Sequence, residues 1–309
     1  MVLVAKPGGR GGPGGAGAGG KDGMRGPTSH DIVDQVRRAL ATRRVGHLGT
    51  LDPFASGLLV VIVGRATRLA PYVAGWAKAY EGVIRLGETT STDDATGATL
   101  AASDGWRSLD RVRVEAAVSR FRGAYEQRPP AYSAVKVEGE RAYRRARRGE
   151  AVTLPARRVE VGEFALTSFA PPDLGFRATV SAGTYLRGLA RDLGEELGCG
   201  AHLATLVRTR VGPFRLDDAV APEAVTPADL RDPAVLVAEL PRRELDQAGR
   251  AAVIHGRPVS ARLGLRGSGL GAGIPSATSP VALFADGQLV AVAEWEGEVL
   301  KPRVVVVDE

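Results

Sequence analysis

Apolar residues along the chain follow both the two-residue period of strands and the longer period of helices. The unbroken apolar run over 58–63 is typical of a strand buried on both faces, and residues 79–86 alternate between apolar and polar positions. After Thr28, which has an acid three residues later, apolar residues recur at helical spacing from Ile32 to Leu40. The same criteria predict strands over 2–5, 157–166 and 176–182, and helices over 66–74, 108–121 and 184–197. Because strands and helices do not alternate regularly, we predict an α+β fold with a mixed, largely antiparallel sheet and flanking helices.

The C-terminal part of the chain has a different pattern. A stretch punctuated by prolines and acids over 222–241 precedes short strand-like runs over 281–284, 289–295 and 303–307. Asp286-Gly287 is a strong hairpin turn between the first two runs. We therefore predict two domains, a larger one over 1–240 and a small β-rich one over 241–309.

Residues 8–26 are mostly glycine and predict a flexible insertion, because ordering so many glycines costs more conformational entropy than their contacts return. Within this insertion, Gly15 to Lys21 matches the G-x-x-x-x-G-K pattern of a phosphate-binding loop. Asp22 stands where that loop has a magnesium-binding hydroxyl, and no strand leads directly into it. We therefore expect no nucleotide cofactor.

Composition points to a nucleic-acid partner. The formal net charge is +6, the sequence pI is about 9.7, and only five of the 41 basic residues are lysine. A guanidinium suits bidentate phosphate contact, although biased codon usage also explains an excess of arginine. Cys199 is the only cysteine, which excludes internal disulfides and cysteine-rich zinc sites and fits a reducing cytoplasm. With no signal sequence and no apolar run of membrane-spanning length, we expect a cytoplasmic protein without a membrane partner.

The candidate for chemistry is a carboxylate in a tight turn, Gly46-His47-Leu48-Gly49-Thr50-Leu51-Asp52-Pro53. The glycines permit close backbone approach or positive φ, and Pro53 biases Asp52 towards an extended conformation. The apolar run that follows anchors the turn to a core. Asp52 is therefore either a presented catalyst or merely the cap of a turn.

Two further clusters leave alternatives open. Tyr80 lies on the apolar face of the strand over 79–86, where its ring either packs in the core or stacks on a base. Arg187 follows Gly183-Thr184-Tyr185 at a strand-to-helix junction, where it is either the partner of a carboxylate or an exposed side chain.

A basic stripe follows Gln127-Arg128-Pro129-Pro130. If this stretch is helical, four arginines share one face with no acid between them, which favours contact with a nucleic-acid backbone over a merely solvated helix. The nearby prolines and Gly139 indicate a mobile arm over about 124–152. The stripe consists of Arg141, Arg144, Arg145 and Arg148.

Five ordered blocks together resemble the TruB family of bacterial tRNA pseudouridine-55 synthases. The resemblance runs from Lys6-Pro7 to about Phe214, and the tail resembles the PUA-type domain that bacterial members carry. The blocks are Gly46-His47-x-Gly49-Thr50-Leu51-Asp52-Pro53, Lys78-x-Tyr80, Gln127-x-Pro129-Pro130-x-Tyr132-Ser133-Ala134-x-Lys136, Gly183-Thr184-Tyr185-x-Arg187 and Arg208-Thr209-x-Val211-Gly212-x-Phe214.

The resemblance implies a pseudouridine-synthase fold and the isomerisation of uridine 55 in the T loop of tRNA, with no metal and no cofactor. Asp52 matches the catalytic aspartate, which attacks the sugar, attacks the uracil ring or assists elimination; the sequence does not choose among these routes. Tyr80 matches the tyrosine that stacks on the flipped uracil. Arg187 matches the arginine that pairs with the aspartate and keeps it ionised.

The remaining matches are to RNA-binding positions. Tyr185 matches a pocket residue, His47 a histidine that helps to extrude bases, and Arg208 a residue expected to contact RNA. Lys136 and the basic stripe match a mobile arm that closes over RNA. The expected partner is the T-stem loop of tRNA, and we expect a monomer.

The sequence departs from the family pattern at three places, and three alternative interpretations of its function accompany the resemblance. The glycine-rich insertion interrupts the family's compact N-terminal motif, Leu48 replaces a residue that is commonly Thr, and Val207 stands where a second Arg is common. The rivals are a catalytically silent RNA-binding protein, a nucleotide-dependent enzyme and a synthase that acts on another RNA. The first has no reason to combine Asp52, Tyr80 and Arg187, and Asp22 argues against the second.

Overall fold

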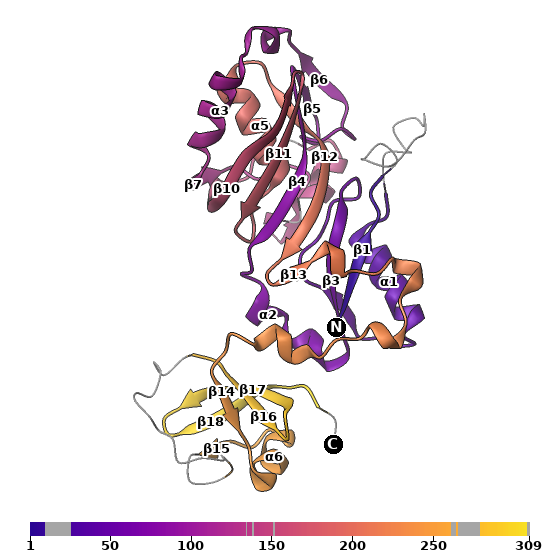
Figure 1. The fold of residues 1–309 in the computed structure, drawn as a ribbon, viewed down its shortest axis with the longest axis vertical. Coiled ribbons are helices and arrows are strands. Elements are labelled where there is room, and N and C mark those ends of the chain that lie inside the picture. The colour runs from indigo at the N-terminus through magenta and orange to yellow at the C-terminus, as the bar shows by residue number, and fades with distance from the viewer. Residues whose placement is uncertain are drawn as a thin grey trace.

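The computed structural model describes residues 1–9, 26–133, 135–137, 139–150, 152–260, 264 and 279–307, with the side chains of 136, 137, 141 and 147 excluded. The predicted glycine-rich insertion lies outside the described residues except at its ends. The described residues form a nine-stranded and a five-stranded sheet besides two short hairpins, and the five-stranded sheet lies at one end of an elongated body (Figure 1).

The larger sheet has nine strands within the described residues, in the order β1-β3-β12-β4-β11-β10-β7, with β2 beside β3 and β13 beside β12. Its described strand pairs are antiparallel except for β3 and β12, which run parallel. The predicted mixed, largely antiparallel sheet is thus confirmed. The strands are β1 (Val2–Lys6), β2 (Val45–His47), β3 (Ser56–Val63), β4 (Lys78–Leu86), β7 (Gly123–Gln127), β10 (Arg157–Ala170), β11 (Asp173–Val180), β12 (Ala201–Val211) and β13 (Phe214–Arg215).

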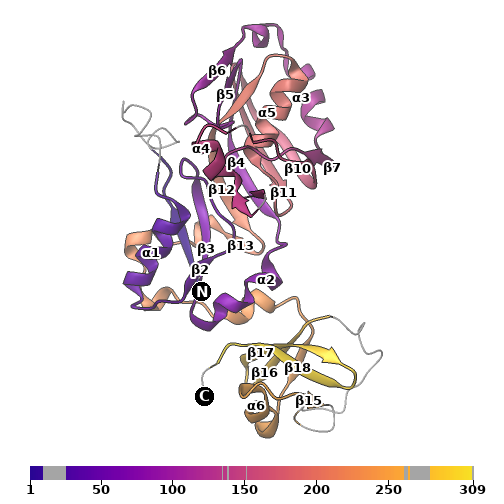
Figure 2. The same ribbon diagram turned by 180° about the vertical axis from the view of Figure 1, so that it is seen from behind.

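Helices pack against the larger sheet both at strands β4, β10 and β11 and at strands β1 and β3 (Figures 1 and 2). The apolar side chains of α3 (Arg111–Arg120) and α5 (Leu186–Leu197) join those of β4, β10 and β11 in one core cluster. Helix α1 (Ser29–Ala39) packs on β1 and β3 through Ile32, Val33 and Val36. Strand β3 is buried on both faces, as its unbroken apolar run predicts: Leu59 and Val61 face α1, whereas Leu58, Val60 and Ile62 face a separate cluster.

Several helix boundaries differ from the sequence prediction. Residues 66–74, predicted as one helix, divide into a 3₁₀ helix over Gly64–Leu69 and α2 (Ala70–Val73), which has Pro71 in its first turn. Helix α5 begins at Leu186, two residues later than predicted, and ends at Leu197; the following Gly198, with φ of 75°, is the left-handed cap. Two short hairpins complete this part: β5 (Glu88–Thr90) with β6 (Thr99–Ala102), and β8 (Lys136–Val137) with β9 (Glu140–Arg141).

The predicted helical stripe of arginines is only partly helical. Helix α4 (Ala142–Arg147) contains Arg144 and Arg145, whereas Arg141 ends strand β9 and Arg148 lies in the turn after the helix. A main-chain bond from Arg148 to the Arg145 carbonyl, 3.0 Å long, closes this turn. The condition that 141–148 is one continuous helix is therefore not met, because Arg141 belongs to strand β9.

The smaller sheet has five strands within the described residues, in the order β14-β16-β17-β18-β15. Phe284, Leu289 and Val292 of this sheet belong to an apolar cluster that also contains Leu236 and, from strand β3 of the larger sheet, Leu58. The described residues contain no helix long and apolar enough to cross a membrane. The elements of the smaller sheet are β14 (Arg242–Glu244), α6 (Gln247–Ile254), β15 (Val259–Ser260), β16 (Val281–Ala285), β17 (Gln288–Glu296) and β18 (Val299–Val305).

Candidate active site

The loop between β2 and β3 carries Asp52, and buried side chains bind its backbone through hydrogen bonds. Gly49 has φ of 87°, a conformation that other residues rarely adopt. The Ser29 hydroxyl, at the start of α1, accepts from the Leu51 N–H at 2.9 Å and donates to the Leu51 carbonyl at 3.0 Å. The Lys6 ammonium donates to the carbonyls of Pro53 at 3.2 Å and Ala55 at 2.5 Å.

Arg208 on β12 completes this support. Its Nε donates to the Leu58 carbonyl at 2.8 Å, and its two Nη atoms donate to the carbonyls of Thr50 at 3.3 Å and Gly49 at 3.1 Å. The side chain is 0% exposed. Several carbonyls of the loop are therefore bound by fixed donors, so the loop presents Asp52 from a rigid base.

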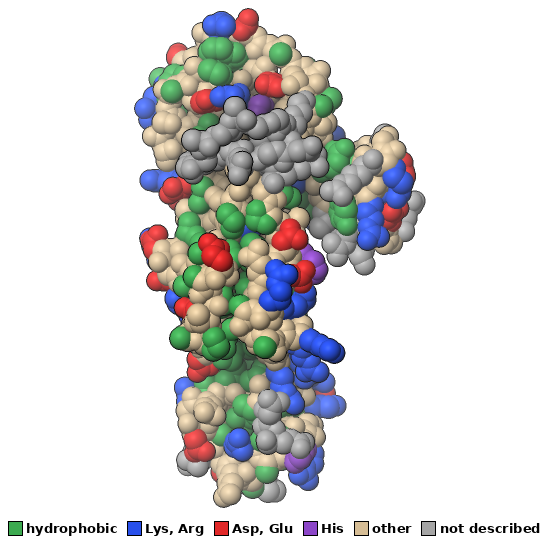
Figure 3. All heavy atoms as spheres, turned by 90° about the vertical axis from the view of Figure 1, so that its right-hand side faces the viewer, with side chains coloured by type: hydrophobic (Ala, Val, Ile, Leu, Met, Phe, Trp, Pro, Cys, Tyr) green, Lys and Arg blue, Asp and Glu red, His purple; other side chains and the backbone are tan. Residues whose placement is uncertain are grey.

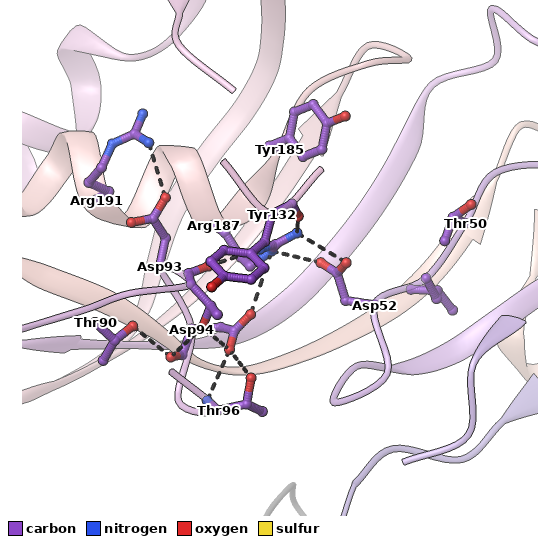
Figure 4. A network of polar contacts seen from close by, with 12 residues as sticks. Thr50, Asp52, Thr90, Asp93, Asp94, Thr96, Tyr132, Tyr185, Arg187 and Arg191 are labelled. Atoms are coloured by element: carbon purple, nitrogen blue, oxygen red, sulfur yellow. Dashed lines mark hydrogen bonds and ion pairs between the residues drawn. The ribbon is translucent and has the colours of Figure 1, made fainter. Parts of the chain in front are cut away.

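Arg187 and Asp52 form a bidentate pair, as Figure 4 shows. Nε lies 2.9 Å from Oδ2 and Nη2 lies 3.2 Å from Oδ1. The Arg187 side chain is 5% exposed, whereas that of Asp52 is 34% exposed. The guanidinium is thus the buried partner, and the carboxylate keeps an open side towards solvent.

Two other segments also accept hydrogen bonds from Arg187. Nη1 donates to the Thr92 carbonyl and Nη2 to the Tyr132 carbonyl, both at 2.9 Å. Burial alone would lower the pKa of Arg187, but the charges of Asp52 and Asp94 outweigh it and raise that pKa. One guanidinium therefore joins the Asp52 loop, the turn after β5 and the segment after β7.

Asp94 is a second carboxylate of the site that the sequence reasoning missed. Its Oδ2 lies 3.7 Å from Arg187 Nε, and its Oδ1 accepts from the hydroxyls of Thr92 and Thr96 and from the Thr96 N–H. The side chain is 6% exposed. The available signal was the run Thr90 to Thr96, in which an acid has hydroxyls two residues away on both sides and so favours a side-chain-capped turn.

Tyr80 lies on β4, directly opposite Arg208 on β12. It is 7% exposed and belongs to the same apolar cluster as Leu51 and Phe54, on either side of Asp52 in the chain. Burial raises the pKa of Tyr80, and the neighbouring Arg208 charge opposes that effect. The ring thus packs beneath the Asp52 loop, and its stacking on a base stays a prediction.

Family models and curated relatives match this chain. A model of the TruB family pseudouridylate synthase N-terminal domain matches residues 37–186, and a tRNA pseudouridylate synthase B C-terminal domain model matches 187–248. The chain is 46% identical over 292 residues to tRNA pseudouridine synthase B of Thermobifida fusca, covering 91% of this chain and 94% of that one. It is 42% identical over 295 residues to the Mycobacterium leprae protein of the same name, covering 91% and 88%.

The chain belongs to the TruB family. The resemblance stated from the sequence blocks is thereby confirmed, and this TruB-family protein is an RNA pseudouridine synthase.

Two solved structures share the fold of this TruB-family chain. A chain in a Cbf5-Nop10-Gar1 complex superposes with a TM-score of 0.66 at 25% identity, covering 100% of this chain and 83% of that one. A chain in the structure of an H/ACA RNP bound to a substrate RNA containing 2′-deoxyuridine gives a TM-score of 0.67 at 22% identity, covering 99% and 84%. These likenesses support the α+β fold expected from the sequence.

The structure places the expected RNA-binding residues in different settings. Tyr185 immediately precedes α5 beside the Asp52–Arg187 pair (Figure 4). His47 lies on β2, with its Nδ1 buried and without a hydrogen-bond partner in the described part of the chain. Burial, with the nearby charge of Arg208, lowers the pKa of His47. Arg208 corrects the expectation of RNA contact, because its guanidinium is buried beneath the loop rather than exposed above it.

The basic arm projects from the body of the molecule (Figure 3). The side chains of Lys136 and Arg141 lie outside the described residues, so their roles stay predictions. Arg148 donates to both Glu140 oxygens at 2.7 and 2.8 Å and to Glu150 at 2.7 Å. Arg145 also donates to Glu150, at 2.8 Å, so the acids that flank the stripe in sequence pair with it in space.

Gln127 is another residue whose role the sequence reasoning missed. It is 0% exposed; its Oε1 accepts from the Tyr185 N–H at 2.8 Å, and its Nε2 donates to the Tyr185 carbonyl at 3.0 Å. Nε2 also donates to the Tyr125 hydroxyl at 2.5 Å. The position of Gln127 in a sequence block gave no sign of this contact, which fixes the backbone two residues before Arg187. Among the described residues, no group of His, Cys, Asp and Glu is arranged to hold a metal ion.

Proposed function

We propose that this pseudouridine synthase isomerises uridine 55 in the T loop of tRNA, with Asp52 as the catalytic carboxylate. The observation that carries the proposal is the pairing of a partly exposed Asp52 with a buried Arg187 on a loop whose carbonyls are fixed from beneath. The curated relatives are named tRNA pseudouridine synthase B, which supports tRNA as the substrate.

The chemistry requires that the bond from N1 of uracil to the sugar breaks and that a bond from C5 to the same sugar carbon forms. The proton on C5 leaves and N1 gains one, so no atom is gained or lost overall. Such a rearrangement needs a positioned carboxylate, a route for one proton and a pocket that keeps the detached base in place. Arg187 takes one lone pair on each Asp52 oxygen, and further lone pairs stay available towards the open side.

A uracil inside a duplex or a folded loop cannot reach Asp52, so the target base has to leave its stack. In our proposal the base enters between the Asp52 loop and α5, with Tyr80 beneath it and Tyr185 beside it. His47, five residues before Asp52, occupies the space that the base vacates. The lowered pKa of His47 favours a neutral imidazole, which inserts among bases at a smaller desolvation cost than a cation.

Phosphate contacts come from the arm and from the smaller sheet. Figure 3 shows Lys and Arg side chains along the edge of the molecule from which the arm projects. We propose residues 1–240 as the catalytic domain, 124–152 as its RNA-binding arm and 241–309 as a PUA-like RNA-binding domain. Strand β7 holds residues 123–127 in the larger sheet, so the part of the arm that moves begins after Gln127. We further propose a cytoplasmic monomer that acts on the T-stem loop.

The test uses an unmodified tRNA transcript with chelator present and no cofactor, and scores pseudouridine at each uridine. We expect conversion at position 55 by the unaltered protein and none by Asp52→Asn, with tRNA affinity retained. Asp173→Asn is the matched control, because Asp173 also pairs bidentately with an arginine, Arg85, but on the exposed surface. Product at another uridine would change the proposed substrate position, and a fully active Asp52→Asn variant would reject Asp52 as the catalyst.

A further inference from the structure

Arg191 lies one helical turn after Arg187 on α5. Its side chain contacts the turn after β5, the segment after β7 and its neighbour Asp192 on the same helix. Nη1 donates to Asp93 Oδ2 at 3.0 Å, and Nη2 donates to the Arg128 carbonyl at 2.7 Å. Nε and Nη2 also bind Asp192 Oδ1 at 2.9 and 2.7 Å. The side chains of Arg191 and Asp93 are each 19% exposed, so this ion pair is much less solvated than the surface pairs of the molecule.

Arg187 and Arg191 bind the same two segments at neighbouring points. In the turn after β5, Arg187 contacts Thr92 and Asp94, and Arg191 contacts the residue between them, Asp93. In the segment after β7, Arg187 binds the Tyr132 carbonyl and Arg191 binds the Arg128 carbonyl. Because residues four apart lie on one face of a helix, Arg187 and Arg191 together connect α5 to both segments. Figure 4 shows the pairs of Arg187 with Asp52 and of Arg191 with Asp93.

The turn that Arg191 binds contains a residue with a strained backbone. Asp93 has φ of 59°, in the left-handed region that a non-glycine residue occupies only at a cost. Its main chain donates to Thr90 and accepts from Leu203, and its side chain accepts a hydrogen bond from Arg191. A shift of this turn would move the Thr92 carbonyl and Asp94, both of which orient Arg187.

We propose that Arg191 is a positioning residue for pseudouridine formation: by fixing the 92–94 turn and the base of the arm, it holds Arg187 in the geometry that pairs with Asp52. The inference rests on the proposed function of Asp52. Arg191 does not contact Asp52, so its effect passes through Arg187. Loss of the Arg191 contacts shifts Arg187 relative to Asp52 but removes neither residue. A displacement of about 1 Å is enough to slow a reaction by about a hundredfold.

The experiment compares Arg191→Gln, Asp93→Asn and the double variant in single-turnover reactions on the tRNA transcript. We expect each single variant to lower the rate constant between about tenfold and about a hundredfold while tRNA affinity changes by less than about threefold. Asn tolerates the left-handed conformation of residue 93, so Asp93→Asn removes the charge with little backbone cost. The double variant should react no more slowly than the slower single variant, because Arg191→Gln already breaks the contact that Asp93→Asn weakens.

The control is Arg85→Gln, which breaks the exposed pair with Asp173 and should leave the rate constant unchanged. A fall in melting temperature without a fall in rate for Arg191→Gln and Asp93→Asn would overturn the proposal, as would additive effects in the double variant. If Arg191→Gln does not fold, Asp93→Asn alone decides the outcome. Unaltered protein and Asp52→Asn are run in parallel, so failure of the proposed function is seen separately as absent product in the former or full activity in the latter.

Discussion

Buried cationic side chains organise the site at the scale of single residues. Lys6, Arg187 and Arg208 are each at most 5% exposed, and each donates to main-chain carbonyls of loops that would otherwise lack partners. Sequence reasoning identified Asp52 and Arg187 as a candidate pair. It could not show that Arg208 is buried, because an arginine in a strand has the same pattern whether its guanidinium faces carbonyls or solvent.

Lys6 should make the stability of the protein depend on pH in the alkaline range. Burial lowers its pKa from 10.5 to about 8, although the charge of Asp52 opposes this effect. Between these two values the unfolded chain binds a proton that the folded chain does not, so the free energy of unfolding rises with pH, by up to about 1.4 kcal/mol per pH unit. Lys6→Met should lose that contribution.

The measurement is urea unfolding of both proteins at several pH values from 7.5 to 10. The comparison has to be a difference between the two, because Lys78 also has its pKa lowered to about 8 by burial and contributes to both curves. Parallel curves for the two proteins would show that Lys6 stays protonated throughout this range.

At the scale of elements, the junction between β11 and α5 positions Arg187, and Gln127 on β7 fixes that junction. The amide satisfies both polar groups of the Tyr185 backbone, which has no side-chain cap at the start of the helix. Sequence patterns predicted α5 and β4 because their apolar periods are regular. Strand β12 was missed, because it buries His202 and Arg208 and its pairing with β4 is interrupted by two register shifts, which break the two-residue alternation.

Replacement of Gln127 by Met should therefore destabilise the fold while nearly keeping the side-chain volume. The Tyr185 N–H loses its partner, whereas its carbonyl keeps the bond from the Leu189 N–H, which predicts a loss of about 1–3 kcal/mol in the free energy of unfolding. Urea unfolding measures this loss, and Gln288→Met is the control, since residue 288 is exposed at the start of β17 and should change stability by less than about 0.5 kcal/mol. Equal stabilities of the two variants would show that water replaces the amide.

At the scale of the whole molecule, the nine-stranded and five-stranded sheets share an apolar cluster, and bonds from Arg187 and Arg191 to main-chain carbonyls connect the base of the arm to α5. The sequence predicted the basic character of the arm from spacing alone. It could not predict the pairing of Glu140 and Glu150 with the stripe, because that pairing depends on the β8–β9 hairpin and on the turn after α4, which bring separate residues together.

These two acids should compete with RNA phosphates for the arm. Arg148 binds Glu140 and Glu150 together, and burial does not strengthen these pairs, since all three side chains are at least 36% exposed. Each carboxylate paired with Arg148 offsets part of the positive charge that would attract an RNA phosphate. Glu140→Gln/Glu150→Gln should therefore bind tRNA more tightly, with a steeper fall of affinity as salt rises, because two more cations of the arm face phosphate without an internal counter-ion.

Arg144→Ala/Arg145→Ala/Arg148→Ala should do the opposite and reduce the slope of log K against log salt by about 2. Titrations of fluorescent tRNA between about 50 and 200 mM salt measure both slopes, and identical slopes for the two variants would reject the arm as a phosphate clamp.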